Sequence, residues 1–242
     1  MKRNRRRVCL LSVAALPLLI SLEAAAADSS CADPAVPVAA ILMPPPKQDS
    51  AHTKAELQEL LRLQEARTPR QVEHVKGDDH RTVERFLGGM GIKVEQLSAS
   101  ANHFFECIGA AVEKSVRDAK TTFMRTRPYR LHESKLHTLK KLSDRDSTSY
   151  PSGHATYGAV VGMVLVEMLP EKKEEIYKRI QDYGYSRLIS GAHFRSDVYA
   201  GNIAGAAIAA SLMNQDSFRD ELKKVKVELR KAVGLESDRA AK

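Results

Sequence analysis

Apolar residues recur at helical intervals along most of this chain. In "TKAELQELLRLQEAR", Leu60 and Leu61 stand three and four positions after Leu57, which places them on one helical face. Thr53 is the expected N-cap, with Glu56 three residues later as in a capping box. Strand-like alternation is hard to find, so the pattern predicts an all-α protein. Further helices are expected over about 71–87, 94–117, 155–168, 171–182, 197–213 and 216–233.

Two of these segments are almost entirely apolar, "ATYGAVVGMVLVEML" and "VYAGNIAGAAIAASLM". Both are rich in small residues and shorter than the roughly 20 apolar residues that a membrane span needs. Gly201 and Gly205 would let a neighbouring backbone approach closely, as a central core helix requires. We therefore expect the two segments to form a buried pair inside a single compact helical bundle.

The first 27 residues differ from the rest of the chain. A basic head is followed by an apolar run over 8–22 and by small residues that end near Ala27. This is the layout of a secretory signal peptide, and the run is shorter than a membrane anchor needs. The run Arg5-Arg6-Arg7 leaves a twin-arginine export route open. We expect cleavage near residue 27 and a periplasmic or secreted mature protein.

The rest of the chain divides by composition. Residues 28–50 hold five prolines and many alanines, which predicts a proline-rich extended arm rather than a packed element. Residues 51–235 form the predicted helical domain, and 236–242 a flexible C-terminal tail. The arm could cross to a neighbouring subunit, so a homo-oligomer is one expected arrangement.

The charge balance changes once the leader is removed. The whole chain has 38 basic and 30 acidic residues, a formal net charge of +8. The leader holds five of the basic residues and one of the acidic ones, which leaves 33 against 29, or +4. This mild excess is spread along the chain, so nucleic-acid binding is not expected.

Two cysteines, Cys31 and Cys107, remain after Cys9 leaves with the leader. In an oxidising compartment they could pair, but sequence does not fix the distance between their Cα atoms. A disulfide and two unpaired thiols both stay open at this point. The chain has no CxxC and no His/Cys cluster at zinc spacing, so a structural zinc site is not expected.

Three polar clusters adjoin the apolar segments, and each alone is ordinary. "KTTFMRTRP" carries cations, "YPSGH" is a turn that opens a helix, and "SRLISGAHFRSD" places a histidine four residues before an aspartate. Their order and spacing, K-x6-R-P, P-S-G-H and S-R-x5-H-x3-D, make the combination specific. The candidate site residues are Lys120, Arg127, Ser152, Gly153, His154, Arg187, His193 and Asp197.

The ordered pattern resembles the phosphatidic acid phosphatase type 2 (PAP2) superfamily. This superfamily includes bacterial acid phosphatases, membrane lipid phosphatases and vanadium-dependent haloperoxidases. The resemblance is greatest to the class A bacterial non-specific acid phosphatases, which share the proline-rich start and an "SGAH…SD" block. The motifs span residues 120–197, with looser similarity over about 44–212. Ser149 and Ala155 stand where the family often has Gly and Thr. The resemblance implies a PAP2/chloroperoxidase-like helical fold.

The resemblance also implies a phosphate site. A phosphoryl transition state spreads negative charge over three oxygens, which Lys120, Arg127 and Arg187 would neutralise. The Ser152 hydroxyl and the Gly153 N–H would add neutral donors at a helix start. No metal or other cofactor is then needed, and vanadate is the expected inhibitor.

Catalysis would fall to the remaining three residues. By resemblance, His193 is the nucleophile that forms a phosphohistidine, and Asp197 fixes its tautomer. His154 would protonate the leaving group and then activate water. His193 would start neutral and His154 charged, which predicts a bell-shaped pH profile with an optimum on the acid side. Ser186 is interpreted as structural support, and Arg125 and Arg195 as surface or supporting residues.

The leading hypothesis is a secreted acid phosphatase that hydrolyses small phosphate monoesters. Three alternatives remain: a vanadate-dependent haloperoxidase, a lipid phosphate phosphatase, and a periplasmic module that binds phosphate without turnover. Chain length argues against the haloperoxidase. The absence of a core segment of spanning length argues against the membrane enzyme. Simple binding gives no reason for two histidines and an aspartate.

Overall fold

The computed structural model describes residues 31–140 and 148–235. The predicted signal peptide and C-terminal tail therefore lie outside the described residues. Within them the chain is helical and has no β-strand, apart from an isolated bridge between Thr126 and Thr148. The all-α prediction is thus confirmed. The helices are α1 (Val38–Ile41), α2 (Ala51–Ala66), α3 (Pro69–Gly77), α4 (Glu84–Leu87), α5 (Ala99–Phe123), α6 (Pro128–Leu131), α7 (Gly153–Met168), α8 (Lys173–Ile189), α9 (Arg195–Met213) and α10 (Asp216–Ala232).

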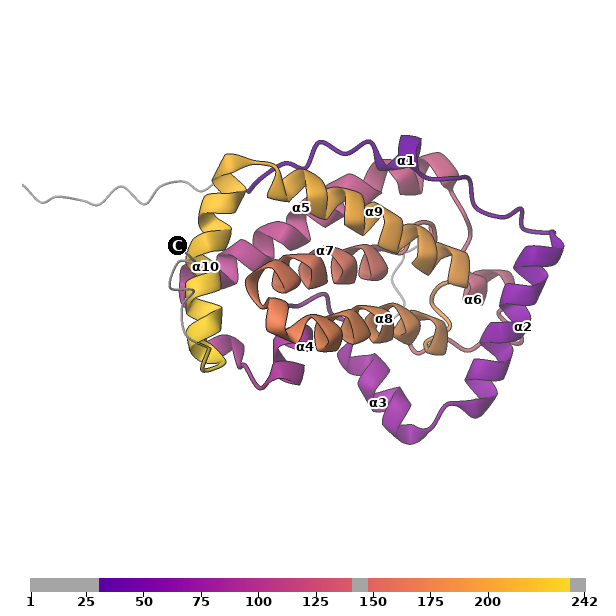
Figure 1. Cartoon of the computed structure of the whole chain (residues 1–242). Helices are drawn as coiled ribbons and strands as arrows, with labels where there is room; N and C mark the ends of the chain where they lie inside the picture. Colours follow the sequence, from indigo (N-terminus) through magenta and orange to yellow (C-terminus); the bar gives the residue numbers. More distant parts are fainter. Residues whose placement is uncertain (1–30, 141–147, 236–242) are drawn as a thin grey trace, which may run out of the picture. The chain divides into compact units, whose positions relative to one another are not determined.

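Helices α7 and α9 form the predicted buried pair at the centre. Helix α7 lies among the other helices (Figure 1). It contacts α5, α8, α9 and α10, and most of its residues are buried. A Cβ atom on Gly201 would lie 2.6 Å from the Ser152 carbonyl oxygen, and one on Gly205 would lie 2.6 Å from that of Thr156. No side chain fits at these two crossings, so the glycines set the close approach of the helices.

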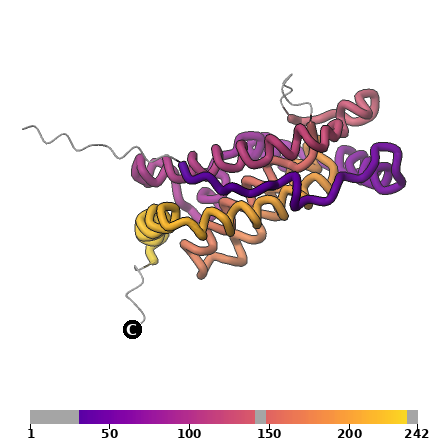
Figure 2. The backbone as a smooth tube through the Cα atoms, turned by 90° about the horizontal axis from the view of Figure 1, so that it is seen from above, coloured from indigo at the N-terminus to yellow at the C-terminus, as the bar shows by residue number. Residues whose placement is uncertain are grey.

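The N-terminal arm is extended over most of residues 31–50, but it is packed. It runs between α5 and α9 (Figure 2) and buries Val38 and Leu42 in the main core. A disulfide between Cys31 and Cys107, with Cα atoms 5.0 Å apart, ties it to α5. The prediction of an unpacked arm was therefore wrong, because its apolar side chains have a core to cover. Of the two open states of the cysteines, the structure contains the disulfide.

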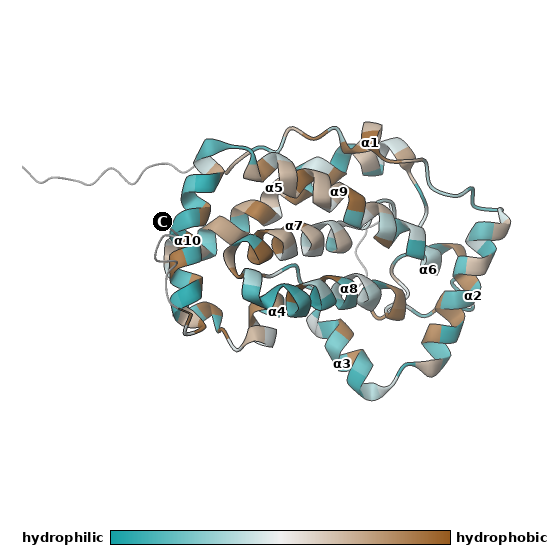
Figure 3. Cartoon of the chain, in the orientation of Figure 1, coloured by the Kyte–Doolittle hydropathy of each residue, from teal (hydrophilic) through white to brown (hydrophobic). Residues whose placement is uncertain are grey.

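Helix α10 covers one end of the central pair. Its buried residues Phe218, Leu222, Val225 and Leu229 recur at the spacing of a single helical stripe. Figure 3 shows the rest of this helix as largely hydrophilic. This is the pattern of a surface helix with one face on the core.

The predicted helix over 71–87 is wrong. Helix α3 ends at Gly77 and α4 begins at Glu84, so residues 78–83 form a loop. Asp78 is fully buried there, where it accepts a hydrogen bond from Arg85 at 2.9 Å and pairs with Arg179. Pairing this buried carboxylate with two guanidinium groups outweighs continuation of the helix.

Other helix boundaries also differ from the predicted ones. The N-cap of α2 is Ser50, which accepts from the Thr53 N–H at 3.2 Å, so the predicted Thr53 cap and capping box are wrong. Helix α5 begins at Ala99 after the Ser98 N-cap. Helix α8 extends seven residues beyond the predicted end at 182.

Membrane crossing requires a long apolar helix. In the described parts of the chain, no helix combines the length and hydropathy needed to span a bilayer.

Candidate active site

The three sequence clusters meet at one cleft of about 590 Å³. The loop after α3, the C-terminal half of α5 and the start of α7 form its walls. Five of the eight predicted site residues line this cleft, and they are Lys120, Arg127, Gly153, His154 and His193. The other three, Ser152, Arg187 and Asp197, are buried directly behind the lining.

The conformation of the third sequence cluster is set by the turn that ends helix α8. The Ala192 N–H donates to the Arg187 carbonyl at 3.1 Å, and the Gly191 N–H donates to that of Leu188 at 2.9 Å. These two bonds are a Schellman motif, and Gly191 has the left-handed φ of +69° that it requires. The turn ends α8 at Ile189 and places His193 just before α9. Gly191 is therefore required by the backbone of this turn.

His193 contacts Asp197 as the four-residue spacing suggested, although the histidine precedes the helix. His193 Nδ1 lies 3.4 Å from Asp197 Oδ2. Ser149 Oγ lies 3.3 Å from the same nitrogen and donates to the same carboxylate oxygen. The Phe194 N–H donates to that oxygen at 2.8 Å. Asp197 is thus held in place from three sides at the start of α9.

The second ring nitrogen of His193 faces Arg127. Arg127 Nη1 lies 3.0 Å from His193 Nε2 and also donates to the Ala192 carbonyl oxygen at 2.9 Å. A guanidinium group only donates, so Nε2 is the acceptor and the ring proton sits on Nδ1, toward Asp197. The lone pair on Nε2 is therefore directed toward Arg127, and both side chains line the cleft.

Burial and charge favour one protonation state for this pair. Burial, then the Arg127 charge, lowers the pKa of His193 to about 3, against the opposing effect of Asp197. Burial alone would raise the pKa of Asp197, but the hydrogen bond from His193 and the charge of Arg125 outweigh it and lower the pKa to about 2. His193 is thus neutral beside an ionised carboxylate, which agrees with the expected state of the histidine.

Arg125 is a residue whose importance the sequence did not indicate. It is buried, and its Nη1 donates to Asp197 Oδ1 at 2.6 Å, while its Nη2 donates to Glu56 Oε2 at 2.9 Å. Its guanidinium carbon lies 4.2 Å from the centre of the Phe194 ring. Arg125 is therefore a buried supporting residue, whereas Arg195 is half-exposed and pairs with Glu59 at the surface.

His154 is held by a backbone carbonyl. Its Nε2 lies 3.1 Å from the Asp79 carbonyl oxygen, which only accepts, so Nε2 carries the proton and Nδ1 is the remaining basic atom. Burial, followed by the nearby Arg187 charge, lowers the pKa of His154 well below its usual value. Burial and the neighbouring cations thus favour neutral His154 in the protein without substrate, contrary to the expectation that it starts charged.

Arg187 lies in the layer behind the cleft. It is 1% exposed, and its Nη1, Nη2 and Nε donate at 3.1 Å to Asp79 Oδ1, the Val75 carbonyl and Ser186 Oγ respectively. Ser186 is thus a supporting residue, as interpreted from the sequence. Asp79 was missed because it fell inside a predicted helix.

Ser152 is bonded to backbone groups on both sides of the site. Its hydroxyl accepts from the Ala155 N–H at 3.3 Å as the N-cap of α7, and its N–H donates to the Asp197 carbonyl at 3.0 Å. The bond from the Ser152 N–H to the Asp197 carbonyl joins the second sequence cluster to the third. Gly153, the first residue of α7, lines the cleft at the helix N-terminus.

Further cations line the cleft besides the predicted Lys120 and Arg127. Lys120 Nζ donates to the Thr148 carbonyl at 3.2 Å, and Arg81, which also lines the cleft, pairs with Glu113. Arg117 and Lys140 add further positive charge to the lining. Apart from Lys120, these residues lie outside the three motifs, so only the fold reveals them.

The region that contains the three motifs is similar to known proteins. Residues 103–221 match the PAP2 superfamily. The predicted resemblance is confirmed, and all eight predicted site residues fall within the PAP2 region. The loop that supplies Asp79 and Arg81 lies before it, so residues outside the matched stretch complete the cleft.

Several individual proteins are also similar to this chain. The chain is 42% identical over 115 residues to a non-specific acid phosphatase of Salmonella typhimurium, which covers 46% of this chain and 45% of that protein. It is 34% identical over 148 residues to an acid phosphatase of Zymomonas mobilis, covering 60% and 54%. For a non-specific acid phosphatase of Providencia stuartii the identity is 34% over 151 residues, covering 60% of each. The chain spans about half the length of the curated relatives it matches.

A solved structure is also similar. It is that of a transmembrane PAP2 type phosphatidylglycerolphosphate phosphatase from Bacillus subtilis, with 21% sequence identity and a TM-score of 0.48. The similarity covers 72% of this chain and 87% of that chain.

Proposed function

We propose that this protein is a metal-independent acid phosphatase that hydrolyses phosphate monoesters. The observation that carries the proposal is His193, whose Nδ1 lies 3.4 Å from Asp197 and whose Nε2 lies 3.0 Å from Arg127 in a cation-rich cleft. The geometry provides a neutral nucleophile beside donors for an anion. The acid phosphatase relatives and the PAP2 match support the same activity.

The cleft has the charge needed to bind a phosphate dianion. Lys120 and Arg127 supply cations, and Gly153 supplies an N–H from the first turn of α7, where backbone donors lack helical partners. We expect the phosphate to replace Asp79 as the partner of Arg187 Nη1, since both are anions. Exchange of one anion for another leaves the buried guanidinium paired throughout.

The chemical step follows from the tautomers. When the phosphate binds, the Arg127 N–H turns from His193 Nε2 to a phosphate oxygen, which frees the Nε2 lone pair. His193 Nε2 then attacks the phosphorus atom, the bond to the ester oxygen breaks, and the leaving oxygen takes a proton from His154. His193 becomes a phosphohistidine whose ring proton on Nδ1 is held by Asp197. His154, now neutral, accepts a proton from a water that attacks phosphorus, and inorganic phosphate leaves with His193 restored.

This sequence of steps requires His154 to gain a proton when substrate binds. Without substrate, the pKa of His154 is lowered by burial and by the charge of Arg187. A bound dianion offsets the cationic neighbours and favours the charged form. Activity should therefore favour acidic solution, where protonation of His154 is easier.

The remaining parts of the proposal follow from the same site. No metal or other cofactor has a role in these steps, and vanadate, which adopts the geometry of the transferred phosphoryl group, should inhibit. The predicted signal peptide supports a periplasmic or secreted location. The substrates are small phosphate esters.

The test is hydrolysis of a chromogenic aryl phosphate in the presence of a metal chelator. We expect turnover that vanadate inhibits and that His193→Ala abolishes. The matched control is His103→Ala, which removes a half-exposed histidine on α5. Rapid quenching into alkaline denaturant should trap phosphate on His193, since phosphohistidine survives alkali. Undiminished turnover in His193→Ala would refute the mechanism, and binding of phosphate without turnover would refute the enzyme.

A further inference from the structure

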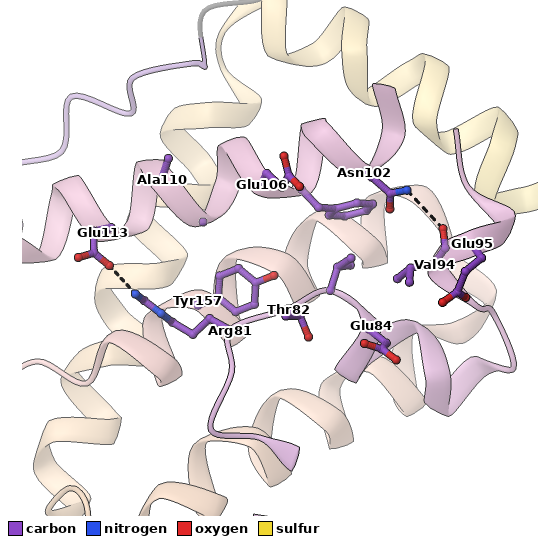
Figure 4. Close-up of a pocket in the computed structure, with 13 residues that line it drawn as sticks. Arg81, Thr82, Glu84, Val94, Glu95, Asn102, Glu106, Ala110, Glu113 and Tyr157 are labelled. Atoms are coloured by element: carbon purple, nitrogen blue, oxygen red, sulfur yellow. Dashed lines mark hydrogen bonds and ion pairs between the residues drawn. The ribbon is translucent and has the colours of Figure 1, made fainter. Parts of the chain in front are cut away.

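A second cavity of about 790 Å³ adjoins the cleft. We call it the α5 groove, and the residues that matter for its properties are Arg81, Glu84, Glu106, Gly109, Glu113 and Tyr157 (Figure 4). Arg81 and Glu113 line both spaces, and their ion pair marks the border between them. A molecule that occupies both the cleft and the groove must therefore pass this ion pair.

Helix α5 forms a common wall for both spaces. Glu106, Glu113 and Lys120 are spaced by seven residues, which places them on one face at intervals of about 10 Å. Lys120 lies in the cleft, Glu113 at the border and Glu106 in the groove. A substrate with its phosphate at Lys120 needs a body of about 10 Å to reach the groove.

The floor of the groove carries the hydroxyl of Tyr157, which is accessible to a ligand. Tyr157 is 2% exposed, and its hydroxyl has no hydrogen-bond partner among the described residues. Figure 4 shows this hydroxyl directed into the groove, between α5 and the segment that carries Thr82. Gly109 faces the ring edge, where a Cβ would lie 3.8 Å from Tyr157 Cε2, so the absence of a side chain leaves this space open. The hydroxyl can therefore donate to or accept from a ligand without giving up a protein partner.

The charge of the groove is opposite to that of the cleft. Four glutamates line it, Glu84, Glu95, Glu106 and Glu113, whereas Arg81, already paired with Glu113, is the cation among the described lining residues. Such a rim repels an anionic group and attracts a cationic one. The two adjoining spaces together suit a molecule with a phosphate at one end and an ammonium group at the other.

We propose that the α5 groove binds the leaving group of the phosphate ester and selects one with an apolar body ending in an ammonium group. The ammonium group would donate to the Tyr157 hydroxyl oxygen and lie among the glutamates. The inference rests on the proposed phosphatase function, and it names the substrate class that this site prefers.

The test compares four phosphate esters by kcat/KM. Ethyl phosphate is too short to reach the groove. The aryl esters are 4-(2-aminoethyl)phenyl, 4-propylphenyl and 4-(2-carboxyethyl)phenyl phosphate, in which the two-carbon spacer keeps the leaving oxygens chemically similar. We expect the amino ester to exceed the carboxy ester by about tenfold at low salt. The ratio should shrink at high salt, because the rim carboxylates are exposed to screening.

Three variants test the groove itself. Gly109→Leu fills it and should lower kcat/KM for the three aryl esters by about tenfold, with ethyl phosphate changed less than about twofold. Glu106→Gln and Tyr157→Phe should each reduce the ratio of amino to carboxy ester. Matched controls are Gly88→Leu, at a glycine where an added Cβ would have no neighbouring atom within 4 Å, and Glu65→Gln, on the exposed side of α2. Neither control should change any ratio.

The outcomes separate the two proposals. If the wild-type protein hydrolyses none of the four esters, the phosphatase function fails. If it hydrolyses them all but the aryl esters show no charge preference, or Gly109→Leu affects ethyl phosphate equally, the groove inference alone fails. Should Gly109→Leu not fold, as judged by circular dichroism, an unchanged ester ratio in Glu106→Gln and Tyr157→Phe would overturn the inference.

Discussion

Arg125 Nη1 lies 2.6 Å from Asp197 Oδ1, and the two side chains are 6% and 0% exposed. The same arginine pairs with Glu56 of α2, which accepts from the Ser196 N–H at 2.6 Å. Arg125 thus connects α2 to the start of α9 and supports the carboxylate that contacts His193. Arg125 was not among the predicted site residues, yet it holds in place the motif that carries His193 and Asp197.

Arg125→Met should destabilise the protein by about 3–5 kcal/mol, because Asp197 and Glu56 would be left as buried charges without a cation. Urea unfolding measures this change. The control Arg195→Met removes a surface arginine paired with Glu59 and should cost less than about 1 kcal/mol. Equal effects of the two variants would contradict the supporting role of Arg125.

Acid should destabilise the protein through its buried histidines. The folded pKa of His193, about 3, lies below the unfolded value near 6.5, so the unfolded chain binds more protons in this window. The free energy of unfolding should then fall as pH falls from about 6.5 toward 3, by up to about 1.4 kcal/mol per pH unit. His193→Gln should flatten this slope between pH 6.5 and 4 in denaturant titrations. An unchanged slope in the variant would mean that His193 is not buried in its neutral form.

Ser149→Ala should lower kcat by about tenfold and leave KM nearly unchanged. Ser149 donates to Asp197 Oδ2 and contacts His193 Nδ1, so its loss should loosen the histidine and raise the pKa of Asp197. The pH dependence of kcat should shift with it, which a purely structural role would not produce. Ser115→Ala, which removes a hydroxyl bonded to its own helix, is the control.

Gly205→Ala should destabilise the central pair by about 1–3 kcal/mol, since the new methyl group would lie 2.5 Å from Ala159 Cβ. Helix propensity alone would favour alanine by about 1 kcal/mol, so the sign of the change is diagnostic. The control Gly89→Ala introduces a methyl group with no atom within 4 Å. A stabilised Gly205→Ala variant would show that α7 and α9 do not cross here.

Loss of the disulfide should destabilise the oxidised protein by about 2–5 kcal/mol, because the bridge closes a loop of 76 residues. Cys31→Ser, Cys107→Ser and the double variant should have the same melting temperature, and none should respond to reductant. Non-identical single variants, or a wild-type protein insensitive to reductant, would contradict the bridge.

Local pattern was sufficient for much of this protein. The apolar periodicity predicted α2, α5, α7, α8, α9 and α10, although several of their ends differ. The glycines of "VYAGNIAGAAIAASLM" predicted a close central pair, because a residue without a side chain permits close approach. The three motifs identified the residues that converge on the cleft, since each motif is a short segment at a helix end. The PAP2 resemblance followed from the same motifs.

Other features depend on partners far apart along the chain, and only the tertiary structure decided them. Arg125 and Asp197 are separated by 72 residues, and Arg187 and Asp79 by 108. Burial of Asp78 interrupts a helix that local periodicity would continue, and the packed arm brings Cys31 to Cys107. Desolvation and pairing of buried charges require the whole fold, because the cost of burial depends on what surrounds each group rather than on its neighbours in sequence.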